Sequence, residues 1–210
     1  MRCDCGTELV IGLDSTPAGY YISHLCKECG PQQKLSEVLD MGFALTGLAM
    51  EQKVISLEFD GACEPRNPGG IATFGWRIVQ HKQQLAYGYG EVCRGKEATN
   101  NVAEYTALIR GLEAISDLGI EYEALIIKGD SQLVIYQLDV DPRYGKSWAC
   151  RSKKLQPLKA KVESLLPWNT YFWWRPREFN QEADNLSKQA YSISRREKEP
   201  WYKRFKTATL

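Results

Sequence analysis

Residues 54–70 constrain the fold of this chain more than any other stretch; their sequence is VISLEFDGACEPRNPGG. Apolar and polar side chains alternate over residues 54–59, which predicts a half-buried β-strand. Asp60 and Gly61 come next, and a loop rich in proline and glycine follows. We therefore expect the Asp60 carboxylate to lie where the backbone leaves a β-sheet. One acid in that position is usually a solvated turn residue, so its meaning depends on the other acids of the chain.

The composition of the 210-residue chain is that of an ordinary globular protein, with 43% hydrophobic and 25% charged residues. This length suffices for one well-packed domain and a small appendage. No apolar stretch is long enough to span a bilayer, and the N-terminus does not resemble a signal peptide. The seven cysteines are an odd number, which argues against a secreted disulfide framework. We expect a cytoplasmic, monomeric protein without a membrane partner.

The net charge of +1 conceals an uneven distribution. Residues 1–50 hold three basic and six acidic residues, for a charge of −3, whereas residues 191–210 hold six basic and two acidic residues, for +4. Residues 143–161 contain seven basic residues and no acid. Such a local basic strip on a neutral domain suits a polyanionic partner. A solvated helix face explains the strip equally well when it is considered alone.

Four cysteines near the N-terminus form two pairs that resemble metal-binding knuckles. Cys3 and Cys5 form a C-x-C pair, Cys26 and Cys29 form a C-x-x-C pair, and a glycine follows each pair. Four thiolates can hold one tetrahedral Zn²⁺, and a segment this short cannot form a core of its own. We therefore predict a zinc-ribbon-like module over residues 1–34, with one structural Zn²⁺ and a hairpin between the knuckles.

Two alternatives to this zinc site stay open. The four cysteines are free thiols in a reducing compartment, or His24 replaces one of them as a ligand. Residues 35–53 are expected to connect the module to the next domain. Ser36 can cap a helix in this connection, although two glycines weaken the helix.

The pattern over residues 54–192 predicts one α/β domain. Strands are expected over residues 54–59, 71–80, 85–93, 125–128 and 171–174, and helices over residues 99–118, 131–138, 153–166 and 181–192. The second and third strands flank a short polar turn and should form a hairpin. The resulting fold is a five-stranded mixed sheet flanked by helices.

Three further acids lie at positions that match the setting of Asp60. Asp130 ends the fourth predicted strand as Asp60 ends the first, and two parallel neighbouring strands would bring both carboxylates to one edge of the sheet. Glu104 lies at the edge of the apolar stripe of the long helix, where a carboxylate needs a metal or another partner. Asp184 lies early in the final helix. These four acids are the candidate metal ligands.

Four motifs around these acids closely resemble those of the ribonuclease H type 1 family. They are FDGACEPRNPGG at Asp60, TNNVAEYTAL at Glu104, GDSQLVI at Asp130 and FNQEADNLS at Asp184. The resemblance covers about residues 54–192 and implies the ribonuclease H-like fold. It also implies an endonuclease that hydrolyses the RNA strand of an RNA–DNA hybrid and leaves 5′-phosphate and 3′-hydroxyl ends.

The resemblance further implies that Asp60, Glu104, Asp130 and Asp184 hold two Mg²⁺ or Mn²⁺ ions beside the scissile phosphate. Two such ions, about 4 Å apart, activate the attacking water and stabilise the leaving 3′ oxygen. Clustered carboxylates supply the hard oxygen ligands that these ions prefer.

The same resemblance assigns substrate contacts to five residues near these acids: Asn67, Thr99, Asn100, Asn101 and Gln132. Asn100, Asn101 and Gln132 match positions that contact 2′-hydroxyls and base edges in the minor groove, and an amide carries both donors and acceptors for such groups. Thr99 matches a position that binds a DNA phosphate. Thr99 and Asn100 also suit helix capping, and the two roles are compatible.

The chain departs from well-known members of this family in the loop before Asp184. Those members carry a histidine there, whereas residues 175–180 have the sequence RPREFN, as in members that use arginine instead. We expect Arg177 to take the catalytic place of that histidine through its positive charge, because a guanidinium does not exchange protons near neutral pH. A surface ion pair of Arg177 with Glu178 or Glu182 is the alternative.

The tail, residues 193–210, mixes basic and aromatic residues. This mixture suits nucleic-acid binding and a strap that packs on the domain equally well. A non-catalytic nucleic-acid-binding adaptor on the same fold is the alternative function, and a nuclease specific for DNA is a third. The four acids argue against the adaptor, because they would repel phosphates without contributing to binding.

Overall fold

The computed structural model describes residues 10–16, 19–26, 30–31, 54–80, 83–141 and 143–196. The chain forms two compact units, Met1–Gln52 and Lys53–Leu210, and each is described by itself. No helix within the described ranges is long and apolar enough to cross a membrane.

The first unit contains a small antiparallel sheet in the order β1-β2-β3. Its strands are β1 (Val10–Thr16), β2 (Gly19–Cys26) and β3 (Gly30–Pro31). The pairing of β1 with β2 confirms the predicted hairpin. Cys3, Cys5 and Cys29 lie outside the described residues, as does the predicted helix after Ser36, so the zinc site stays a prediction.

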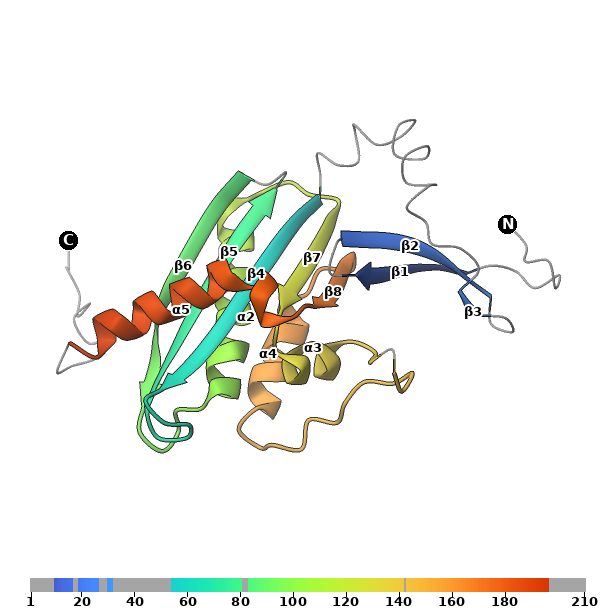
Figure 1. Cartoon of the computed structure of the whole chain (residues 1–210). Coiled ribbons are helices and arrows are strands. Elements are labelled where there is room, and N and C mark those ends of the chain that lie inside the picture. Colours follow the sequence, from blue (N-terminus) through green and yellow to red (C-terminus); the bar gives the residue numbers. More distant parts are fainter. Residues whose placement is uncertain are drawn as a thin grey trace. The chain divides into compact units, whose positions relative to one another are not determined.

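The second unit is built on the predicted five-stranded mixed sheet, in the order β6-β5-β4-β7-β8. Its strands are β4 (Val54–Glu64), β5 (Ile71–Gln80), β6 (Gln83–Arg94), β7 (Ala124–Gly129) and β8 (Thr170–Trp174). The first three strands form an antiparallel meander, whereas β7 is parallel to both β4 and β8. Figure 1 shows β4 at the centre of this sheet.

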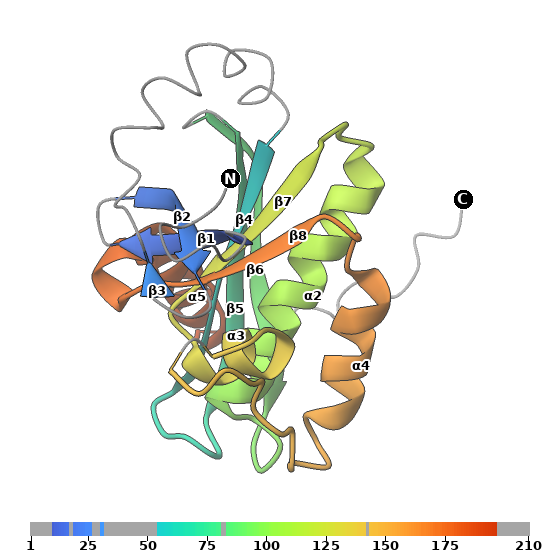
Figure 2. The same ribbon diagram turned by 90° about the vertical axis from the view of Figure 1, so that its right-hand side faces the viewer.

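Helices cover both faces of the sheet (Figure 2). One face carries α2 (Asn100–Leu118), α3 (Gln132–Leu138) and α4 (Gln156–Leu165), whose apolar side chains form the main core with the sheet. The other face carries α5 (Gln181–Ser194), which packs on β4, β5 and β6 and follows the 3₁₀ turn Arg177–Phe179. This order of elements agrees with the expected one.

Two predicted boundaries were wrong by three residues or more. Strand β4 does not end before Asp60 but continues to Glu64, because its pairing with β5 extends to Glu64 and Ile71. Its pairing with β7 ends earlier, at Glu58 and Lys128, so Asp60 still lies beyond the end of its parallel neighbour. Helix α4 begins at Gln156, three residues later than expected, since Pro157 has no N–H to donate and fits only the first turn.

The expectation that the first strand of this unit is half-buried was also wrong. Leu57 and Phe59 face the core as expected and are fully buried. On the opposite face, however, Ser56 and Glu58 are 7% and 4% exposed. Arg77 and Arg175 form ion pairs with Glu58, which explains how a carboxylate is accommodated there.

Candidate active site

Gly61 allows helix α2 to lie directly against strand β4. A Cβ atom at Gly61 would lie 2.2 Å from the backbone nitrogen of Glu104 and 2.4 Å from the carbonyl carbon of Ala103, which no real side chain tolerates. The first turn of α2 is therefore held against the backbone next to Asp60. Thr99 caps this turn by accepting a hydrogen bond from the amide of Val102.

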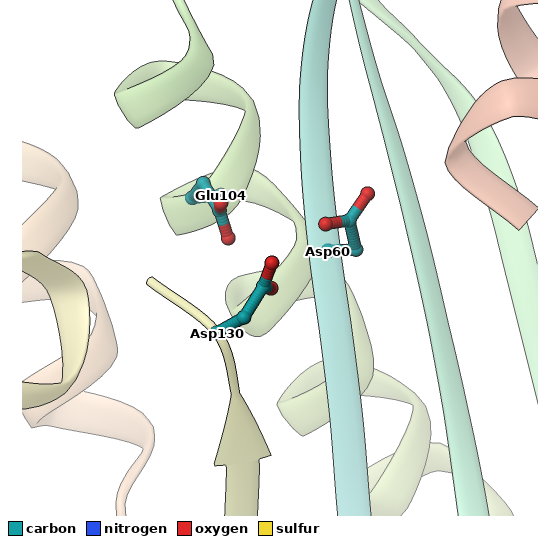
Figure 3. A group of neighbouring side chains, drawn as sticks. All are labelled: Asp60, Glu104 and Asp130. Atoms are coloured by element: carbon teal, nitrogen blue, oxygen red, sulfur yellow. The ribbon is translucent and has the colours of Figure 1, made fainter. Parts of the chain in front are cut away.

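Three of the four predicted carboxylates form one cluster, shown in Figure 3. Asp60 comes from β4, Glu104 from α2, and Asp130 from the residue after β7. One oxygen atom from each lies within 4.8 Å of the others. Their meeting just beyond the parallel pairing of β4 with β7 confirms the expectation that Asp60 and Asp130 lie close together.

Burial and mutual repulsion favour protons on this cluster. Burial is the main cause that raises the pKa of Asp60 to about 6; Asp130 and Asp184 add to the rise, and the hydrogen bond from Ser187 opposes it. The pKa of Glu104 is raised well above its ordinary value, first by burial and then by the charges of Asp60 and Asp130. A cation among the three carboxylates would relieve this repulsion.

Glu104 also has an oxygen that needs a partner. Its Oε2 is buried and accepts no hydrogen bond from any residue that the structure describes. A buried acceptor without a partner is costly, and a buried carboxylate oxygen is especially so. The donor set consists only of hard oxygen atoms, which fits Mg²⁺ or Mn²⁺. Asp60, Glu104 and Asp130 are thus suited to hold such an ion.

Asp184, the fourth predicted acid, is engaged differently. Its Oδ1 accepts a hydrogen bond from Arg177 at 2.5 Å, and its other oxygen accepts one from Lys188, one helical turn later. Burial raises the pKa of Asp184, but the bonds from Lys188 and Arg177 outweigh this effect and hold the pKa below its ordinary value. The surface pair of Arg177 with Glu178 or Glu182 is not what the structure shows, because Arg177 pairs with Asp184.

The sequence interpretation missed two side chains that hold these acids. The hydroxyl of Ser187, in α5, donates a hydrogen bond to Asp60 Oδ2. The amide of Asn180, which is fully buried, donates to Asp130 Oδ1 at 2.8 Å and to the carbonyl oxygen of Phe59 at 2.8 Å. Both residues lie in the motif around Asp184. Polar residues at these buried positions were the signal in the sequence that could have identified them.

The predicted substrate residues divide between a groove and its surroundings. Asn67, Thr99 and Asn101 line a cavity of about 420 Å³, together with Arg151 and Lys154. The remaining two lie elsewhere: Asn100, which is exposed, donates its backbone N–H to Asn67 Oδ1 at 3.2 Å, and Gln132 begins α3 two residues after Asp130.

The basic strip, residues 143–161, is partly neutralised by acids from outside it. Lys154 forms an ion pair with Glu97, Lys161 with Glu113, and Arg143 with Asp141. Arg151 is exposed beside the groove that contains Thr99. Of the two basic residues that line the groove, Lys154 is paired with Glu97, so Arg151 is the part of the strip best placed to meet an anion.

Residues 58–190 match the model of the reverse transcriptase-like family. The chain belongs to this family and has the ribonuclease H fold. It is 39% identical over 153 residues to the uncharacterized protein YpeP of Bacillus subtilis (strain 168), a match that covers 69% of this chain and 62% of YpeP. It is 35% identical over 136 residues to ribonuclease HI of Halobacterium salinarum, a match that covers 63% of this chain and 61% of that protein.

Solved structures of ribonuclease H1 proteins match the second unit in fold. The crystal structure of ribonuclease H1 from Halobacterium salinarum NRC-1 is 34% identical, with a TM-score of 0.57 and coverage of 67% of this chain and 98% of that one. LC11-RNase H1, in complex with an RNA/DNA hybrid, is 28% identical, with a TM-score of 0.58 and the same coverages, 67% and 98%. The chain spans about three fifths of the curated relatives YpeP and ribonuclease HI.

Proposed function

We propose that this protein is a two-metal-dependent ribonuclease H that hydrolyses the RNA strand of RNA–DNA hybrids and leaves 5′-phosphate and 3′-hydroxyl ends. The buried cluster of Asp60, Glu104 and Asp130, with a Glu104 oxygen that lacks a partner, carries the proposal. The ribonuclease H fold and the hybrid-bound structure of LC11-RNase H1 support the choice of substrate.

Asp60, Glu104 and Asp130 would hold one ion, and Asp184 would contribute to the site of the second. When bound, the ions would activate a water molecule for in-line attack and stabilise the departing 3′ oxygen. Ser187 holds one oxygen of Asp60, so the direction of this carboxylate is fixed from the side of α5. The residues around the cluster thus prepare its oxygen atoms for ligation.

The Asp184 carboxylate is held in place by Arg177 and Lys188 and not by the three clustered carboxylates. Arg177 is two-thirds exposed at its side chain, whereas the Asp184 side chain is 8% exposed, so the guanidinium covers the carboxylate from the solvent side. We assign to Arg177 the place of the loop histidine of other family members. Its charge would draw the cleaved phosphate away or neutralise charge in the transition state, without proton transfer.

The groove lined by Asn67, Thr99 and Asn101 would receive the hybrid. Thr99, with Arg151 and Lys154 nearby, would bind a phosphate of the DNA strand. Asn100, Asn101 and Gln132 would contact 2′-hydroxyls and base edges. The N-terminal module, with a predicted structural Zn²⁺ on its four cysteines, is not assigned a role in this chemistry.

One assay tests the proposal directly. End-labelled RNA–DNA, RNA–RNA and DNA–DNA duplexes are incubated with the full chain and Mg²⁺ or Mn²⁺, and the product ends are identified. We expect cleavage of the RNA strand of the hybrid. The Asp130→Asn variant should bind the hybrid but not cut it, because asparagine keeps the hydrogen bond from Asn180 and removes the charge.

The rival function predicts a different result in the same assay. An adaptor would bind the hybrid equally well with and without divalent metal and would leave it intact. Wild-type protein that binds hybrids but cuts none of them under either metal would support that rival. An Asp130→Asn variant with turnover within tenfold of wild type would overturn the assignment of the site.

A further inference from the structure

The buried carboxylate of Glu58 pairs with two partly buried arginines, Arg77 and Arg175, on the α5 side of the sheet and outside the carboxylate cluster. Glu58 Oε2 accepts a hydrogen bond from Arg77 Nε at 2.5 Å and lies 3.0 Å from a terminal nitrogen of Arg175. The side chains of Glu58 and Arg175 are only 5% and 11% exposed. A buried network of this kind is costly unless its members are well satisfied, which suggests a role beyond stability.

Arg175 also contacts the residue that holds Asp130. Its Nη2, which lies 3.0 Å from Glu58 Oε2, donates a hydrogen bond to Asn180 Oδ1 at 2.8 Å. Its Nη1 donates to Glu58 Oε1 at 3.2 Å. The Arg175 Nε has no hydrogen-bond partner among the described residues, so the guanidinium is held by its two terminal nitrogens. Asn180 therefore links the network around Glu58 to the metal-binding cluster.

The contact with Arg175 determines which way the Asn180 amide points. In the observed orientation, Oδ1 accepts from the guanidinium and Nδ2 donates to Asp130 and to the carbonyl oxygen of Phe59. The flipped orientation would set donor against donor at Arg175 and oxygen against oxygen at Asp130. The guanidinium thus ensures that Asp130 receives a donor.

Asn180 connects the two strands that carry the cluster. It bonds to the backbone of Phe59, next to Asp60, and to the side chain of Asp130. The backbone is fixed at the same place, because Trp174 Nε1 donates to the Asp130 carbonyl oxygen at 3.0 Å and the Arg175 amide donates to the Gly129 carbonyl oxygen at 3.0 Å. Hydrogen bonds therefore fix both the backbone and the side chain of Asp130.

We propose that Arg175, anchored by Glu58, which Arg77 also pairs with, is a positioning residue that acts through Asn180 to preset the Asp130 carboxylate for a divalent metal. This inference rests on the proposed metal site but not on the nature of the substrate. Partners that orient metal ligands in this way typically change metal affinity or activity by 10- to 100-fold when they are removed. The Arg175 side chain bonds to Glu58 and Asn180 rather than to the three clustered carboxylates, so its effect should appear in metal affinity.

The test measures Mn²⁺ binding to the full chain by calorimetry or electron paramagnetic resonance. Asn180→Ala should weaken Mn²⁺ binding about tenfold, and Arg175→Met should weaken it several-fold, with about tenfold as the upper limit. The double variant should bind no more weakly than Asn180→Ala alone, because the two residues act in series. Arg110→Met is the matched control: it removes an exposed arginine that pairs with Glu113 on α2, and it should leave Mn²⁺ affinity unchanged.

Cleavage of the hybrid gives a second readout. Arg175→Met should lower the rate at limiting metal and recover at high metal, with the KM for hybrid unchanged, and Arg175→Lys should restore part of the metal affinity. Unchanged Mn²⁺ affinity in a folded Arg175→Met variant, or additive losses in the double variant, would overturn the inference. If Asn180→Ala does not fold, Arg175→Met decides alone. If wild-type protein binds Mn²⁺ but cuts no hybrid, the proposed function fails and the inference stands.

Discussion

Gly61 and Glu104 are in direct backbone contact, since a Cβ on the glycine would lie 2.2 Å from the amide nitrogen of the glutamate. The contact explains why glycine follows Asp60: the strand must let α2 approach so that Glu104 reaches the same cluster. The site therefore requires Gly61 as well as the Asp60 carboxylate.

We expect Gly61→Ala to displace the first turn of α2 and to abolish hybrid cleavage. Overpacking against backbone, which cannot rotate away, should lower the free energy of unfolding by at least about 2 kcal/mol. Urea denaturation and Mn²⁺ binding measure the two effects. Gly88→Ala is the control, because the three atoms nearest to a Cβ there belong to the side chain of Trp76, which lines a cavity of about 690 Å³, and not to backbone. Equal losses in both variants would contradict the explanation.

Glu104→Gln should raise the melting temperature of the protein without added divalent metal at pH 7.5, while it removes cleavage. Glutamine relieves the repulsion that the buried carboxylate has with Asp60 and Asp130. For a domain of this size, each kcal/mol of relief corresponds to roughly 2–4 °C. A melting temperature that falls below that of wild type would show that Glu104 is not an electrostatic burden in the metal-free protein.

The raised pKa values also fix the sign of a pH effect. The folded state holds protons on Asp60, whose pKa is about 6, and on Glu104 more tightly than the unfolded state does. The stability that these two groups contribute is therefore fully present below the ordinary carboxyl pKa and is lost as pH rises through their raised pKa values, about 6 for Asp60. Metal binding must displace these protons, so Mn²⁺ affinity should increase from pH 5.5 to pH 7.5. An affinity that is constant over this range would contradict the shifts.

The order of the elements and the three clustered acids were predictable because their signals are local. Alternation in residues 54–59, helical spacing in α2 and an acid at the end of each of two apolar stretches all depend on short stretches of sequence. The continuation of β4 to Glu64 was missed because it depends on pairing with β5, which the strand pattern alone does not show. The positions of Asn180 and Ser187 depend on how α5 packs on the sheet, and the network around Arg175 joins residues up to 117 positions apart.

The N-terminal cysteines give a prediction that is independent of cleavage. We expect one Zn²⁺ per chain, held by Cys3, Cys5, Cys26 and Cys29, in protein purified without added metal. Four thiolates leave no open coordination position, so this ion should be structural. Elemental analysis measures it, and Cys26→Ser should lower the zinc content. Cys150→Ser, which changes a cysteine of the second unit, is the control. Protein without zinc, or zinc content that Cys26→Ser leaves unaltered, would end this idea.

Arg177→Ala should lower the turnover of hybrid substantially, with little change in KM and in melting temperature. The side chain is largely exposed, so its removal should cost little stability, and Lys188 continues to pair with Asp184. Lys188→Ala is the matched control, because it removes the other cation on the same carboxylate from within α5 rather than from the loop. If charge over the site is what matters, Arg177→Lys should keep more activity than Arg177→Ala.

The pH dependence separates this electrostatic role from proton transfer. The bond to Asp184 raises the pKa of Arg177 further above its ordinary value, so the guanidinium stays charged at every working pH. At saturating metal, the pH–rate profiles of wild type and Arg177→Ala should therefore have the same inflections. In particular, wild type should have no additional inflection near the histidine pKa of about 6.5. Full turnover in Arg177→Ala, or an inflection lost with this residue, would contradict the role. In the first case the four carboxylates and their metals would carry the chemistry without it.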